Sequence, residues 1–79
     1  MRKYKVAYPN LEAELGRAGI LRTELMRLLG LRRTALYNKL MGVTKITLNE
    51  MSAIQAYLEL KTGESFTLEY LFERKNDIK

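Results

Sequence analysis

Residues 29–42 read LGLRRTALYNKLMG, a stretch that begins and ends near a glycine. Leu36 and Leu40 are four residues apart between two glycines, a spacing that predicts a short helix over about residues 32–41. Apolar residues at similar spacing before the first glycine predict another helix ahead of it. Two short helices joined by a glycine-marked turn are typical of a helix-turn-helix, here at about residues 22–41.

The start of the second of these helices carries two arginines, Arg32 and Arg33. Ser, Thr, Asp or Asn usually occupies a helix start, because these side chains accept hydrogen bonds from free backbone N–H groups. A cation at the positive end of the helix dipole instead costs a few tenths of a kcal/mol to about 1 kcal/mol. The free N–H groups also attract anions. We therefore expect a negatively charged partner opposite these side chains.

Four polar side chains share one face of this helix when its residues are placed at 100° intervals, and Leu36 and Leu40 lie on the opposite face. Arg can donate two hydrogen bonds to guanine, Asn can form two with adenine, and Thr offers a hydroxyl and a methyl group. The set is typical of a helix that contacts DNA bases, and an ordinary solvated face is the alternative. The four residues are Arg33, Thr34, Tyr37 and Asn38.

The net charge of +5 is unevenly distributed along the chain. Residues 1–45 hold ten Lys and Arg against three Glu, whereas residues 46–79 hold four Lys and Arg against six acidic residues. A solvated helix face would normally include acids, yet none occurs between Glu24 and Glu50. This distribution favours a surface for a polyanion over a merely solubilising charge.

The composition disfavours several other function classes. The 79 residues, 47% of them hydrophobic, suffice for one small domain. Cys and His are absent, which removes the usual zinc ligands and the commonest acid–base catalyst. We expect no enzyme activity, metal, cofactor or small-molecule substrate. Because no apolar run is long enough for a membrane span or a signal peptide, we also expect no membrane association and a cytoplasmic, nucleoid-associated location.

Capping signals and apolar spacing predict four helices besides the one at about residues 32–41. They are expected over about residues 10–18 with Asn10 as N-cap, over about residues 22–29, from a capping box at Thr47 to near Lys61, and over a short stretch from Thr67.

The predicted fold class is therefore all-α, a compact five-helix domain over residues 10–73. A short N-terminal arm at residues 1–9 precedes it, and a flexible tail at residues 74–79 follows. The arm alternates apolar and basic residues, a weak strand signal, until a proline ends it. Its alternatives are to follow a DNA minor groove, to lie along the domain, to pair with a second chain or to be disordered.

Three stretches together resemble a known family: NLEAELGRAGILRTELMRLLGLRRTALYNKLMG, ITLNEMSAI and TLEYLF. They are similar to the phage repressor/Cro helix-turn-helix family, the lambda-repressor-like or XRE group, and especially to its small single-domain phage and prophage members. The similarity covers about residues 8–73. It implies a lambda-repressor-like fold in which the first helix of the motif crosses the DNA backbone and the second enters the major groove.

The resemblance also implies residue roles. Base contacts fall on Arg33, Thr34 and Asn38, with Tyr37 and Arg32 beside them. Three positions depart from the family pattern, because the usual hydroxyl caps are replaced by Leu21 and Arg32 and the small residue early in the first motif helix is Met26. The implied phosphate contacts are Arg22, Arg32, Thr44 and Lys45.

These observations predict a sequence-specific, double-stranded DNA-binding transcription regulator that occupies an operator and blocks or adjusts polymerase. A symmetric operator requires a homodimer, whose association can be weak without DNA. The alternative is a protein-interaction module such as the antitoxin of a toxin–antitoxin pair.

Overall fold

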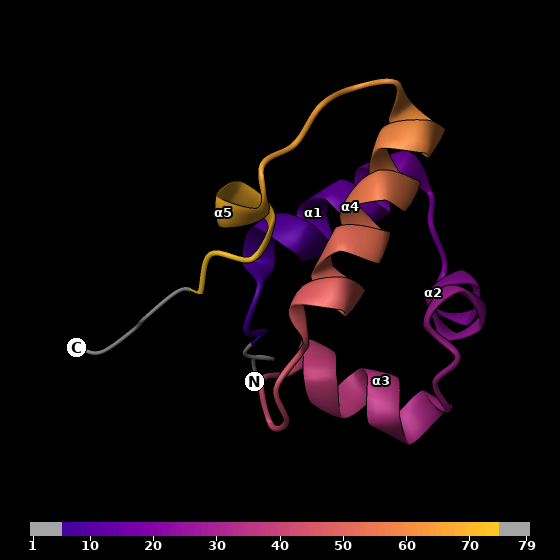
Figure 1. Cartoon of the computed structure of the whole chain (residues 1–79), viewed down its shortest axis with the longest axis vertical. Helices are drawn as coiled ribbons and strands as arrows, with labels where there is room; N and C mark the ends of the chain where they lie inside the picture. Colours follow the sequence, from indigo (N-terminus) through magenta and orange to yellow (C-terminus); the bar gives the residue numbers. More distant parts are fainter. Residues whose placement is uncertain (1–5, 75–79) are drawn as a thin grey trace, which may run out of the picture.

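The computed structural model describes residues 6–74 and contains five helices within them (Figure 1). No strand occurs among these residues, so the predicted all-α fold class is confirmed. None of the described helices is long and apolar enough to cross a membrane. The helices are α1 (Pro9–Ala18), α2 (Arg22–Leu29), α3 (Arg33–Leu40), α4 (Leu48–Thr62) and α5 (Leu68–Leu71).

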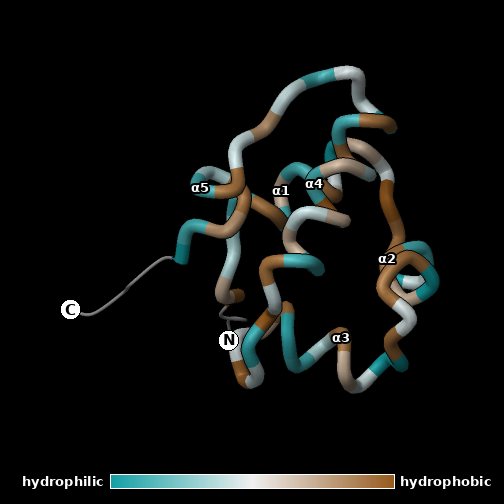
Figure 2. Tube along the Cα trace, in the orientation of Figure 1, coloured by the Kyte–Doolittle hydropathy of each residue, from teal (hydrophilic) through white to brown (hydrophobic). Residues whose placement is uncertain are grey.

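Helix α4 forms the centre of the fold, because it packs against α1, α2 and α5, while α3 packs against α2. Every helix contributes at least one side chain to a single apolar core. The link between α1 and α2 is also hydrophobic (Figure 2), and its Ile20 is buried. The largest fully buried side chains are Leu11, Leu15, Leu25, Leu36, Leu40, Ile54, Leu58 and Leu71.

Helix α1 begins one residue earlier than predicted, so the prediction of Asn10 as its N-cap is wrong. Tyr8 is the N-cap and Pro9 is the first helical residue, a position that suits proline because the N–H it lacks would be unpaired there. The Asn10 side chain instead forms hydrogen bonds with residues near the other end of the chain. It donates to the Tyr70 carbonyl oxygen at 2.9 Å and to Glu73 Oε1 at 3.2 Å, which ties α1 to the α5 region.

The end of the predicted arm belongs to the folded domain. Ala7 and Tyr8 are buried, and the Tyr8 ring packs edge-on against Phe72 with 5.4 Å between ring centroids. Residues 1–5 of the predicted arm and residues 75–79 of the predicted tail lie outside the described residues. Arg74, the first residue of that tail, lies over the Tyr8 ring at 5.6 Å from its centroid.

The start of α4 confirms the predicted capping box. Thr47 Oγ1 accepts the Glu50 N–H at 3.1 Å, and Glu50 Oε1 accepts the Thr47 N–H at 2.9 Å. The α2 start has only half of this arrangement, since the Leu21 side chain cannot accept a hydrogen bond. There Glu24 Oε2 accepts the Leu21 N–H at 3.4 Å.

Candidate nucleic-acid interface

Helix α3 lies along one edge of the molecule, between α2 and the loop that leads to α4 (Figure 1). Its apolar side is closed, because Leu36 and Leu40 are each only 1% exposed. Of the four side chains predicted to contact DNA bases, three are exposed and one is half-buried. The exposed residues are Arg33, Thr34 and Tyr37, and the half-buried one is Asn38.

The start of α3 has no side-chain cap. Arg32 is the N-cap with φ −83° and ψ 167°, and its side chain, which carries only donors, accepts nothing from the helix. The helix start therefore presents cations beside backbone N–H groups that no side chain in the described part of the chain satisfies, and Arg32 is exposed. The predicted 32–41 helix is one residue shorter at each end, with Met41 as C-cap.

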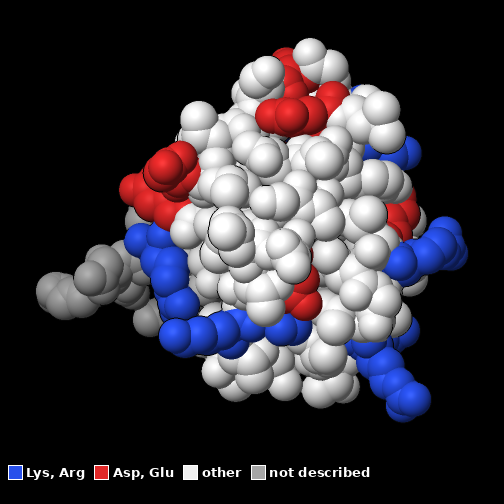
Figure 3. Space-filling view, viewed as in Figure 1, with Lys and Arg blue, Asp and Glu red and all other residues white. Residues whose placement is uncertain are grey.

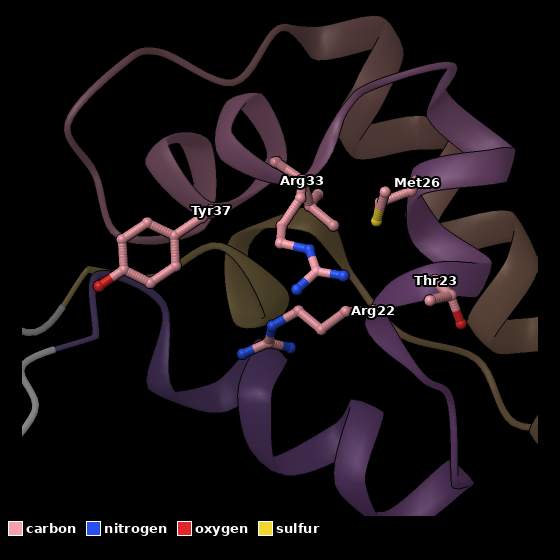
Figure 4. A pocket seen from close by; sticks show the side chains of 6 residues that line it. Arg22, Thr23, Met26, Arg33 and Tyr37 are labelled. Carbon is pink, nitrogen blue, oxygen red and sulfur yellow. The ribbon is translucent and has the colours of Figure 1, made fainter.

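A hollow of about 350 Å³ opens between α2 and α3 (Figure 4). The side chains of Arg22 and Arg33 both line it, although the two residues come from different helices. Two cations at one site repel each other unless an anion or a carboxylate lies nearby. The hollow is lined by Arg22, Thr23, Met26, Arg33, Leu36 and Tyr37.

One carboxylate beside this hollow was missed by the sequence analysis. Glu12 Oε1 of α1 accepts a hydrogen bond from Arg22 Nη2 at 2.9 Å, with side chains 22% and 50% exposed, respectively. Its other oxygen, Oε2, is buried and has no hydrogen-bond partner within the described residues. Glu12 thus fixes Arg22 near Arg33 while it neutralises part of the positive charge. No spacing rule links residues 12 and 22, because the pair forms only in the folded domain, where α1 and α2 both pack against α4.

The loop after α3 folds back onto the helix end. The N–H groups of Val43 and Thr44 both donate to the Asn38 carbonyl oxygen, at 2.9 and 3.3 Å. Lys39 Nζ donates to the Lys45 carbonyl oxygen at 2.9 Å, which braces the same loop. The Thr44 and Lys45 side chains are exposed, as a phosphate contact requires.

Lys39 also joins this loop to α4, since its Nζ lies 3.2 Å from Glu50 Oε1. Burial raises the pKa of Glu50, but the Thr47 N–H and the Lys39 ammonium outweigh burial and hold that pKa below its ordinary value of 4.5. Lys39 is therefore a structural cation, whereas Thr44 and Lys45 remain available to a ligand.

Positive charge extends well beyond the α2–α3 hollow. Figure 3 shows Lys and Arg atoms along the lower part of the view and at its right side, whereas Asp and Glu atoms gather mostly toward the top and the upper left. The structure brings three of the predicted residues together at the hollow, namely Arg22, Arg33 and Tyr37. Thr44 and Lys45 line a second hollow on the loop, and Arg32, Thr34 and Asn38 line neither.

No family model matches the chain, and neither a curated protein nor a solved structure matches it. The resemblance to the phage repressor/Cro family therefore remains a prediction based on the residues quoted above. The ligand of this surface has to be inferred from the chemistry of the surface itself.

Proposed function

We propose that the protein is a sequence-specific double-stranded DNA-binding transcription regulator, with α3 in the major groove. The observation that carries this proposal is the composition of α3: a fully buried leucine side and an exposed side with two basic residues at its start and no acid. A major groove is wide enough to admit one α-helix and offers hydrogen-bonding base edges to its side chains.

The proposed roles follow the chemistry of each side chain. Arg33 suits guanine, Asn38 suits adenine, and Thr34 and Tyr37 supply hydroxyl and apolar contacts beside them. Arg22 at the start of α2 and Arg32 at the start of α3 would contact phosphates. A phosphate would then neutralise the charge of Arg22, as Glu12 does in part in the free protein. Thr44 and Lys45 would contact phosphates at the other end of α3.

Regulation would follow from occupancy of a site near a promoter, which obstructs or adjusts polymerase. A two-fold symmetric site would be bound by two copies of the chain, with half-sites about 34–36 Å apart. The second candidate function is a protein-interaction module of the antitoxin type. Exposed leucines favour it, since Leu60 of α4 is 80% exposed and Leu21 is 62% exposed.

The salt dependence of duplex binding separates these two functions. A protein that contacts six or more phosphates should lose about a thousandfold in affinity between 50 and 200 mM salt, because binding releases counterions from DNA. We expect this loss in a titration of random-sequence duplexes followed by fluorescence anisotropy. Weak binding that does not change with salt would contradict the DNA-binding proposal and favour a protein partner.

A further inference from the structure

A second hollow, of about 390 Å³, lies at the loop between α3 and α4. Two cations from distant parts of the sequence line it, Lys45 of the loop and Arg74 after α5. The hydroxyl-bearing Thr44 lines it as well, and no Asp or Glu of residues 6–74 does. The hollow thus combines two cations and a hydroxyl group on one open surface.

The fold holds the Arg74 side chain against this loop. Its guanidinium lies 5.6 Å from the centroid of the Tyr8 ring, within the range of a cation–π contact. Gly42 has φ +83°, and a Cβ added there would lie 2.6 Å from Arg74 Nη2. Only a glycine lets the guanidinium approach the backbone this closely. Tyr8 is buried, so the core fixes the ring that the exposed Arg74 side chain contacts.

We infer that Arg74 and Lys45 form a phosphate-binding subsite for the DNA backbone at the C-terminal end of α3. This inference rests on the proposed function. The loop directly follows α3, so a helix lying in the major groove would bring it to the groove edge, where the phosphates run. The planar guanidinium of Arg74 can donate two parallel hydrogen bonds to one phosphate, and Lys45 adds a second charge.

The salt dependence of duplex binding by Arg74→Gln tests the inference. Each phosphate contact contributes about 0.9 to the slope of log affinity against log salt concentration. Arg74→Gln should lower the magnitude of the slope by about this amount and weaken binding to all duplexes alike. Arg74→Lys, which keeps the charge, should retain most of the slope. Circular dichroism of each variant checks that the helices remain.

Lys61→Gln is the matched control, because it removes one charge from the last turn of α4. At about 1.5 Å per residue, the 15-residue helix places Lys61 about 20 Å from the loop end of α4. The slope of Lys61→Gln should equal that of the wild type. An equal loss of slope in both variants would overturn the subsite, since the effect would then come from net charge.

Two further outcomes distinguish the subsite from the proposed function. If Arg74→Gln keeps the wild-type slope while Arg33→Ala loses affinity, the subsite is wrong and the proposed function stands. If the wild-type protein itself shows no salt-dependent duplex binding, the proposed function is wrong and the subsite is overturned with it.

Discussion

Glu24 shows how much one side chain can connect in this small domain. Its carboxylate accepts the Tyr57 hydroxyl at 2.6 Å and the Leu21 N–H, and it lies 3.9 Å from Lys61 Nζ. The Tyr57 hydrogen bond, followed by that of Leu21, holds the pKa of Glu24 below its ordinary value of 4.5. The same hydrogen bond raises the pKa of Tyr57. Glu24 therefore serves the α2 start and the α2–α4 contact at once.

This lowered pKa predicts a pH-dependent stability. A carboxyl group whose pKa is lower in the folded state stabilises the fold above its unfolded pKa, and the contribution is lost as the pH falls through the folded value. The unfolding temperature of Glu24→Gln should therefore lie below that of the wild type at pH 7, and the gap should close below about pH 4.5.

Thermal unfolding followed by circular dichroism at pH 7, 4.5 and 3 measures this gap. Glu64→Gln, at an exposed position before α5, is the control and should follow the wild type throughout. A gap for Glu24→Gln that stays constant down to pH 3 would show that the carboxylate charge is not what stabilises the α2–α4 contact.

Helix α3 differs from α4 at its start, and we expect this difference to lower the free energy of unfolding of the free domain. Thr47 caps α4 through its side chain, whereas Arg32 gives α3 no such hydrogen bond. Arg32→Ser should stabilise the free domain by about 1 kcal/mol, because a serine hydroxyl caps the helix and the unfavourable charge is removed. The same substitution should weaken duplex binding, because it removes a proposed phosphate contact.

Urea unfolding and duplex titration of Arg32→Ser check both parts of this prediction. Ala56→Ser, at an exposed position in the middle of α4, introduces the same residue away from a helix cap and should neither stabilise the domain nor weaken duplex binding. An Arg32→Ser protein that binds DNA as tightly as the wild type would contradict the proposal that Arg32 contacts a phosphate.

The elements that sequence analysis predicted well are those set by local signals. The Thr47 capping box and the stop of α2 at Gly30, with φ +68°, involve residues within one or two turns of each other. The start of α1 was predicted wrongly because the Asn10 side chain bonds to residues about 60 positions away. Tyr8 was assigned to the arm for the same reason, since its core partner is Phe72.

Across the whole molecule, the candidate site also combines residues that local sequence predicts with contacts that only the packing of the helices creates. A helical period suffices to place Arg33, Thr34 and Tyr37 together, and the structure leaves all three exposed. The pairing of Arg22 with Glu12 and the approach of Arg74 to the loop depend on how the helices pack. No pattern in a single sequence encodes such long-range contacts.

Base preference tests the central claim, that the exposed side of α3 contacts bases in duplex DNA. Duplexes selected by the wild-type protein from a random pool supply the preferred site, and the affinities of Arg33→Ala, Asn38→Ala and Arg22→Ala are then measured on it and on its single-base variants. Arg33→Ala and Asn38→Ala should each lose about 1–3 kcal/mol and relax the preference at one base pair, whereas Arg22→Ala should weaken all duplexes alike. An Arg33→Ala protein with unchanged base preference would contradict the claim.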